Sequence, residues 1–473
     1  MTHEGRLGWM EFSYLRLGKR FSSCGRKFRV QRLVLWRRKP RTMPVATPNV
    51  SSSAVSMPDS GTSHRAALTV VTSLFFMWGF LTCLNDILVP HLKAIFDLSY
   101  AQVMLIQFAF FSAYFIFSIP SAKLIDWIGY QKAMVLGLVT MALGAVLFIP
   151  AASVPSYPLF LGALMVLAAG ITALQVAANP YVSVLGPART ASSRLNLTQA
   201  FNSLGTFLAP WFGQALIMSS AALSVVEMRQ LAPDALKAYR LHEAASVKLP
   251  YLGLGLALLA LAIAIGRFKL PAMPTAQHHV GDKSVGSVWK HRHLVLGAVG
   301  IFVYVGAEVS IGSFLVNYFS QPEIGNIREK VAAGFVSYYW LSAMIGRFVG
   351  SAILQKVRTG TLLGIVALAA ASLVTISMLT LGHVAMWSII LVGLFNAVMF
   401  PSIFTLGIAE LGPLTGDGSG LLVMAIVGGA ILPVIQGAIA DRIGVHHAFL
   451  LPVLCYLYIV FYAFWGSKPV EAK

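Results

Sequence analysis

Residues 179–186 read NPYVSVLG, and the pattern returns at residues 400–407 as FPSIFTLG. In both stretches a proline, Pro180 or Pro401, stands five positions before a Leu-Gly pair. A second landmark follows each stretch, because GTFLAP ends at Pro210 and GGAILP ends at Pro433. Two proline landmarks in the same order predict that the chain is an internal duplication, in which two halves with parallel topology repeat the same helices.

The composition places these repeats in a membrane. The chain has 473 residues, of which 57% are hydrophobic and 11% are charged, whereas about a quarter of the residues in a soluble domain are charged. A membrane-spanning helix needs about 20 apolar residues. Twelve such segments start near Ala66, Ala101, Ala133, Pro158, Asn196, Pro250, Leu294, Val331, Thr361, Ala385, Gly420 and Ala448. We therefore expect an all-α integral membrane protein with twelve transmembrane helices in two pseudo-symmetric six-helix bundles.

The net charge of +18 is concentrated at the N-terminus, where twelve Lys and Arg residues precede Met43 against two acids, Glu4 and Glu11. The charge therefore does not indicate a nucleic-acid partner. Residues 1–65 are expected to form a basic, disordered tail without a secretory signal. Three readings of this tail stay open: translation that starts at Met43, a basic arm attracted to anionic lipid, or a transit peptide.

Lys and Arg in the connecting segments favour one orientation, with both termini in the cytoplasm. This orientation divides the chain into bundles at 66–267 and 294–467, joined by a cytoplasmic linker at 268–293, with a long external loop at about 220–248. The three cysteines are far apart, so neither a disulfide framework nor a metal site is expected. No cofactor motif and no catalytic motif is found, which argues against an enzyme.

Five longer stretches carry a family resemblance: FFMWGFLTCLNDILVP, QVAANPYVSVLGP, RLNLTQAFNSLG, YVGAEVSIGSFLVNYF and FPSIFTLGIAELG. Together they resemble the fucose/proton symporter and glucose/galactose transporter branch of the major facilitator superfamily. The resemblance implies a major facilitator fold, uptake of a monosaccharide by alternating access, and a bacterial inner-membrane location.

Two acidic residues, Asp86 and Glu308, fall within apolar segments, where a charged group is costly and usually functional. Both are candidates for proton coupling, since a carboxyl in apolar surroundings can switch its charge by protonation. The resemblance supports this role for Asp86 in the motif Asn85-Asp86-Ile87. Fucose symporters carry a glutamate where this chain has Gln175, and tend to carry an amide where it has Glu308, which resembles the glucose/galactose branch. The alternative for both acids is a structural role, satisfied by neighbouring polar groups.

A sugar offers hydroxyl groups and apolar faces, so its site needs amides or carboxylates together with aromatic rings. Gln199 and Asn202 are three residues apart and are expected to share a helix face. The resemblance places Trp78 at a family position for stacking on sugar. Phe400 falls where fucose transporters tend to have a tyrosine, so a ring is kept there but its hydroxyl contact is lost. The full set of expected substrate-binding residues is Trp78, Asn85, Gln175, Asn179, Gln199, Asn202 and Phe400.

Two further features indicate gates. AKLIDWIGYQK, with Asp126 and Gly129, is a partial version of the superfamily signature between the second and third helices, and predicts a tight turn with charge contacts. Arg347, within the eighth span, is expected to serve a gate or to extend toward the membrane surface.

These features favour a secondary active transporter that takes up a hexose, glucose or galactose, with protons. Sodium coupling and fucose as the substrate are the closest alternatives, because carboxylates also bind hard cations. A channel or a membrane receptor is the alternative from another class, and would not require the paired proline landmarks.

Overall fold

The computed structural model describes residues 61–96, 100–153, 156–216, 230–271, 273 and 287–469. The basic tail up to residue 60, including Met43, and most of the linker lie outside this part. The side chains of residues 84–96 also lie outside it, and with them those of the predicted site residues Asn85 and Asp86.

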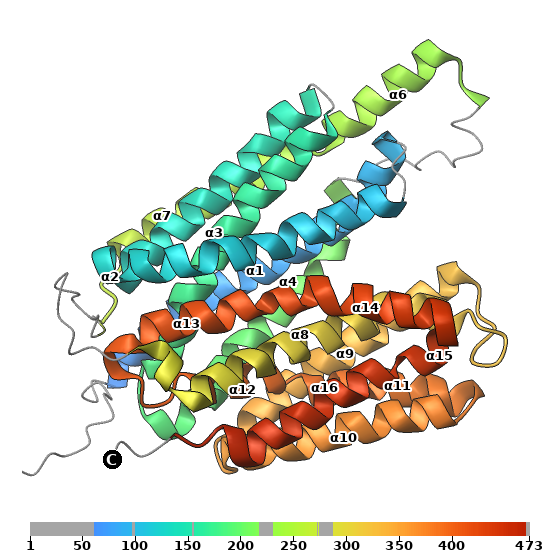
Figure 1. The fold of residues 1–473 in the computed structure, drawn as a ribbon. Helices are drawn as coiled ribbons and strands as arrows, with labels where there is room; N and C mark the ends of the chain where they lie inside the picture. The colour runs from blue at the N-terminus through green and yellow to red at the C-terminus, as the bar shows by residue number, and fades with distance from the viewer. Residues whose placement is uncertain are drawn as a thin grey trace, which may run out of the picture. The chain divides into compact units, whose positions relative to one another are not determined.

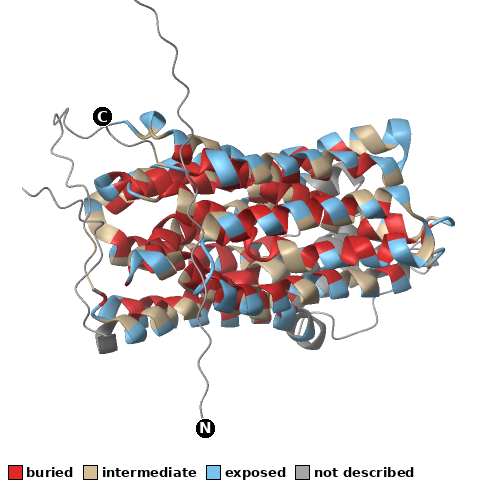
Figure 2. Cartoon of the chain, turned by 90° about the horizontal axis from the view of Figure 1, so that it is seen from below, coloured by how far each residue is buried: buried red, intermediate tan, exposed pale blue. Residues whose placement is uncertain are grey.

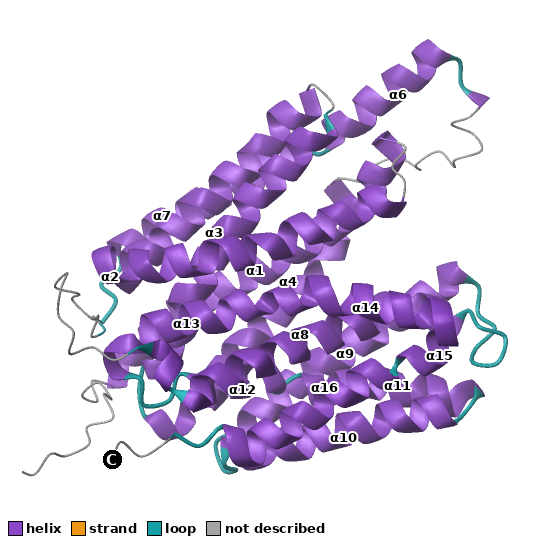
Figure 3. Ribbon diagram, viewed as in Figure 1, coloured by secondary structure: helices purple, strands orange, loops and turns teal. Residues whose placement is uncertain are grey.

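The described residues form helices and connecting turns, without strands (Figure 3). Before the linker the helices are α1 (Gly61–Phe96), α2 (Tyr100–Ser153), α3 (Tyr157–Val184), α4 (Ala191–Leu216), α6 (Pro233–Ser246) and α7 (Lys248–Arg267). After it come α8 (Arg292–Phe319), α9 (Glu329–Ile353), α10 (Thr359–Leu379), α11 (Gly382–Asn396), α12 (Met399–Gly407), α13 (Thr415–Met424), α14 (Gly428–Ile443), α15 (Val445–Ala448) and α16 (Leu450–Phe461). Figure 1 draws the first group in blue to green and the second in yellow to red.

These helices make twelve membrane crossings. Among the described residues, nine stretches are long and apolar enough to cross a membrane, and one of them, Leu105–Ser153, holds two crossings because α2 reverses at Gly129. The pairs α11/α12 and α13/α14 each form one crossing, and α15 with α16 forms another. The remaining two crossings are α4 and α9, which are too polar to count among the nine apolar stretches, although each is long enough to cross.

Burial follows the two bundles (Figure 2). Side chains that face neighbouring helices are buried, whereas large apolar residues such as Leu379 and Val434 point outward and are exposed. An outward apolar surface is expected where lipid is the solvent. A smaller element, α6, lies where a long external loop was predicted. Residues 233–246 of this connection are helical, because DALKAYRLHEAA consists mainly of strong helix formers and Pro233 occupies the first turn.

The internal repeat is visible in the packing. A β-carbon at Gly205 on α4 would collide with the carbonyl oxygen of Phe76 on α1, and one at Gly428 on α14 would collide with that of Phe302 on α8. Small residues let helix backbones approach this closely in membranes. The matching glycines therefore bring matching helices into contact in the two halves.

The prolines behave less symmetrically than the repeat predicts. α3 continues through Pro180, whereas α11 ends at Asn396 and α12 begins at Met399, just before Pro401. Proline lacks the N–H that would bond to the carbonyl four residues earlier, so it can open a helix locally. Pro90 does not end the first helix either, because α1 continues to Phe96.

Candidate functional site

The two bundles meet where α4 and α9 form a polar seam. Ser193 Oγ donates to the Ser351 carbonyl oxygen at 2.7 Å, and Ser351 Oγ donates back to the Ser193 carbonyl oxygen at 3.0 Å. Asn196 Nδ2 donates to the Arg347 carbonyl oxygen at 2.6 Å. Because these bonds join different bundles, they are lost when the two helices separate here. We call this set, with Gln199 and Ser203 on α4, the α4–α9 seam.

Arg347 supplies the charged group of the seam. Its Nη1 donates to the Gln199 carbonyl oxygen at 3.2 Å and also to the Ser203 hydroxyl. Its Nε is buried and has no hydrogen-bond partner among the described residues. The guanidinium is close enough for its charge to act on the carboxyl of Glu308. Arg347 therefore contacts α4 and is within electrostatic reach of the acid on α8.

Glu308 is half-buried and belongs to a cluster of polar side chains inside the C-terminal bundle. The Oη of Tyr304, one helical turn earlier, lies 2.9 Å from Glu308 Oε1 and 3.1 Å from the Asn396 backbone carbonyl oxygen. Asn396 ends α11, and its Nδ2 donates to Tyr339 Oη at 2.8 Å. The cluster thus connects the acid to the break between α11 and α12.

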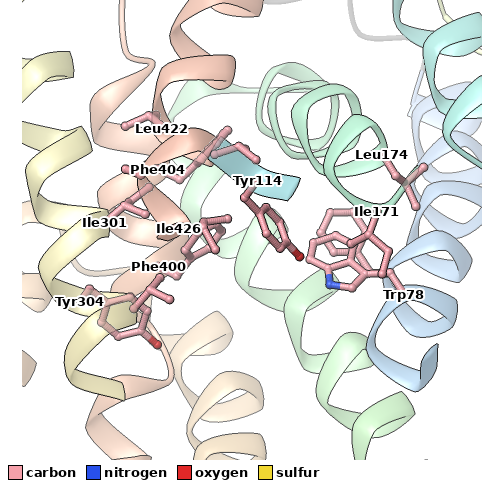
Figure 4. Packing of buried hydrophobic residues seen from close by; sticks show 14 of the residues in the cluster. Trp78, Tyr114, Ile171, Leu174, Ile301, Tyr304, Phe400, Phe404, Leu422 and Ile426 are labelled. Carbon is pink, nitrogen blue, oxygen red and sulfur yellow. The ribbon is translucent and has the colours of Figure 1, made fainter. Parts of the chain in front are cut away.

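The N-terminal bundle presents a second polar and aromatic group. Gln175 Nε2 donates to Tyr114 Oη at 2.8 Å, and the Trp78 ring packs 4.7 Å from the ring of Phe75. Figure 4 shows the Tyr114 hydroxyl directed toward Trp78, with Tyr304 and Phe400 on the other side of the Tyr114 ring. Asn179 is fully buried, and neither atom of its amide has a partner among the described residues.

The predicted pair Gln199 and Asn202 contacts two different neighbours. Asn202 Nδ2 donates to the Phe75 carbonyl oxygen at 3.0 Å, so this amide joins α4 to α1. The backbone carbonyl oxygen of Gln199 accepts a hydrogen bond from Arg347 on α9. Both residues lie on α4, as their spacing predicted. Phe400 opens α12 and stacks on Phe404 with ring centroids 6.0 Å apart.

The predicted gate turn lies at the same end of the helices as residues 191–196. Gly129 has φ of 79° and ψ of 165°, which ends the first half of α2. A β-carbon at Gly416, in the first turn of α13, would stand 3.7 Å from Asp126 Oδ1. The Asp126 carboxylate therefore lies beside the N-terminus of a helix from the other bundle, where backbone N–H groups favour negative charge.

Sequence reasoning did not select Tyr114, Ser203, Tyr304, Tyr339 or Asn396. Tyr304 could have been found, because a hydroxyl four residues before an acid on one helix is within hydrogen-bonding reach. Asn396 and Tyr339 come together only through the packing of α9 on α11, so no spacing in the sequence indicates them.

The model of the Major Facilitator Superfamily matches residues 70–426. The chain belongs to the major facilitator superfamily. This confirms the predicted family and fold, and with them the prediction of a multi-pass membrane transporter and not an enzyme.

Several superfamily members are similar to this chain over most of its length. It is 55% identical over 406 residues to a "Glucose/galactose transporter" of Brucella abortus, covering 86% of this chain and 95% of that one. It is 36% identical to the "L-fucose-proton symporter" of Escherichia coli, covering 86% and 94%. The crystal structure of the transporter FucP in the outward conformation superposes with a TM-score of 0.80 at 35% identity, covering 86% of this chain and 100% of that one.

Proposed function

We propose that this transporter takes up a hexose, glucose or galactose, by symport with protons. The observation that carries the proposal is Glu308, an acid within a membrane-spanning helix that is hydrogen-bonded by Tyr304 and faces the charge of Arg347. Such an acid is retained in a membrane mainly for function. The name of the relative at 55% identity supports the sugar, and that of the fucose-proton symporter supports the proton.

Asp86 is proposed as the first coupling acid and Glu308 as the second. Asp86 lies in α1, and Pro90 four residues later cannot donate an N–H to the Asp86 carbonyl oxygen. The Asp86 backbone carbonyl oxygen therefore lacks the N–H that a helix normally provides from four residues later. The acids lie in different halves of the repeat, so each bundle contributes one group that can carry a proton.

The sugar site is proposed to lie between the bundles. Trp78, Gln175 and Asn179 supply a ring and amides from the N-terminal bundle, while Phe400 supplies a ring from the C-terminal bundle. The buried amide of Asn179 has no partner among the residues that the structure describes, and such groups normally find partners. Sugar hydroxyls can supply them. Asn85, Gln199 and Asn202 complete the proposed set, with Asn202 holding α1 against α4.

Alternating access is proposed to open and close the α4–α9 seam. With both termini in the cytoplasm of a bacterium, as the charge distribution favours, the seam and Asp126 lie at the cytoplasmic side and are closed. The state is then outward-facing, in keeping with the outward conformation of the similar FucP structure. The bundle limits at 66–267 and 294–467 and the linker at 268–293 are part of this proposal.

Uptake by right-side-out membrane vesicles tests the substrate and the ion. We expect labelled glucose or galactose, and not fucose, to accumulate under an imposed proton gradient. Accumulation under a sodium gradient alone would replace the proton with sodium, and fucose accumulation would replace the hexose. Passive equilibration of several sugars without a gradient would instead indicate a channel.

A further inference from the structure

We propose that Tyr304 and Arg347 are positioning residues that link the proton on Glu308 to the closure of the α4–α9 seam. This inference rests on the proposed symport and adds to it a physical connection between one acid and one gate. Neither residue is proposed to touch the sugar. The connection runs from Tyr304 and Glu308 on α8, through the charge of Arg347 on α9, to the groups of α4 that Arg347 contacts.

The first half of the connection is the single hydrogen of the Tyr304 hydroxyl. Oη lies 2.9 Å from Glu308 Oε1 and 3.1 Å from the Asn396 carbonyl oxygen, and it can donate to only one of them. If Glu308 is protonated, its O–H can donate to Tyr304 Oη, and Tyr304 can donate to Asn396. The Glu308 O–H, the Tyr304 hydroxyl and the Asn396 backbone carbonyl oxygen then each have a partner. If Glu308 is ionised, Tyr304 donates to the carboxylate, and the Asn396 carbonyl loses this donor.

The second half is Arg347, whose guanidinium has two competing partners. In the structure its Nη1 is held by the Gln199 carbonyl oxygen and by the Ser203 hydroxyl, both on α4. Its buried Nε has no partner among the described residues, while its charge acts on Glu308. An ionised carboxylate is a stronger acceptor for a guanidinium than a neutral carbonyl or hydroxyl. Ionisation of Glu308 therefore draws Arg347 away from α4.

No other described group around Glu308 could connect its charge to the seam in place of Tyr304 and Arg347. Among the described residues, the titratable or charged groups that act with it are Tyr304 on its own helix, Tyr339 and Arg347 on α9, and Tyr456 on α16. Arg347 is the cation of this set. The groups of α4 that Arg347 contacts are neutral. Arg347 is therefore the residue through which a change of charge on Glu308 can affect the seam.

The two arrangements give a direction for the proton. With the seam closed, Arg347 is bound to α4 and Glu308 holds its proton. When the seam opens, Gln199 and Ser203 move away, Arg347 is free to pair with Glu308, and the proton passes to water on the side that has opened. If that side is the cytoplasm, the device releases the proton inward, as uptake by symport requires.

A distance measurement across the seam in the absence of sugar tests the inference. The full-length protein, with Cys24, Cys83 and Cys455 replaced by serine, receives spin labels at Arg189→Cys, in the turn before α4, and at Lys356→Cys, just after α9; both positions are exposed. Electron–electron double resonance in liposomes then gives the fraction of molecules with separated labels over a series of pH values.

We expect this fraction to rise with pH in the otherwise unchanged protein. Glu308→Gln and Arg347→Gln should abolish the pH dependence, while Arg292→Gln, an exposed basic residue of the same helix as Glu308, should retain it. Tyr304→Phe should move the midpoint to higher pH, because the carboxylate loses a donor. Tyr458→Phe, which removes a hydrogen bond to the Leu296 carbonyl oxygen, should not move it.

The inference would be overturned if the fraction of molecules with separated labels did not depend on pH in the protein without seam substitutions. It would also be overturned if this fraction still depended on pH in both Glu308→Gln and Arg347→Gln. An unmoved midpoint in Tyr304→Phe would remove Tyr304 from it. Sugar uptake by the same liposomes is measured separately. Uptake tests the proposed function, whereas label separation tests the connection between Glu308 and the seam.

Discussion

Removing two hydrogen bonds from the α4–α9 seam should shift the transporter toward the state in which the seam is open. The variant is Ser193→Ala with Ser351→Ala. These residues exchange bonds of 2.7 Å and 3.0 Å between hydroxyl and carbonyl groups, and both side chains are buried. Both bonds cross between the bundles, so they stabilise only the closed seam.

The magnitude follows from the energy of a neutral hydrogen bond, which contributes a net stabilisation of about 0.5–1.5 kcal/mol. Two such bonds correspond to about 1–3 kcal/mol, which shifts an equilibrium between two states roughly 5- to 150-fold. The effect on global unfolding should be smaller than the effect on this equilibrium, since each helix keeps its packing within its own bundle.

The assay is the label separation between Arg189→Cys and Lys356→Cys at constant pH. Ser372→Ala is the matched control, because Ser372 is exposed and bonds only within its own helix, to the Leu368 carbonyl oxygen at 2.9 Å. We expect the double variant to raise the separated fraction and the control to leave it unchanged. An unchanged fraction in the double variant would show that the seam does not govern the opening.

Two other substitutions test the turn and its charge. Gly129→Ala should lower the unfolding temperature, because a φ of 79° with a ψ of 165° is accessible essentially to glycine alone and strains alanine by about 1–3 kcal/mol. Gly253→Ala, in the interior of α7 with open space around it, should not lower it; equal unfolding temperatures of the two variants would contradict the role of the turn. Asp126→Asn removes a charge beside the N-terminus of α13, worth about 0.3–1 kcal/mol, and should raise the separated fraction roughly two- to fivefold at low salt and less at high salt. A shift of the same size at both salt concentrations would exclude this charge interaction.

Features that depend on the order of residues were predictable from the sequence. The apolar segments gave the starts of the helices to within a few residues, because hydrocarbon requires continuous helices of sufficient length. The motifs that contain Gly205 and Gly428 indicated the internal repeat, and the structure places both glycines against the first helix of their bundle, where a side chain has no room. Gly129 was correctly placed in a turn.

Features that depend on which helix faces which were not predictable. Pro401 indicated an irregular helix. It did not indicate that the backbone carbonyl oxygen of Asn396, at the break, would lie 3.1 Å from the Tyr304 hydroxyl. Arg347 was read as a gating residue without a partner, since its partners Gln199 and Ser203 lie on a helix almost 150 positions earlier in the sequence. The polar residues of α4 and α9 lower the hydropathy of these two helices, and the same residues form the seam.

The roles of the two acids can be separated by comparing net accumulation with exchange in right-side-out vesicles. The central measurement is accumulation of the transported hexose under a proton gradient, alongside equilibrium exchange, for the wild type, Asp86→Asn and Glu308→Gln. Glu323→Gln serves as the control, because Glu323 is an exposed acid of the connection between α8 and α9. We predict that each of the first two variants exchanges sugar but does not accumulate it, while the control does both. Normal accumulation in both Asp86→Asn and Glu308→Gln would contradict the proposed proton coupling.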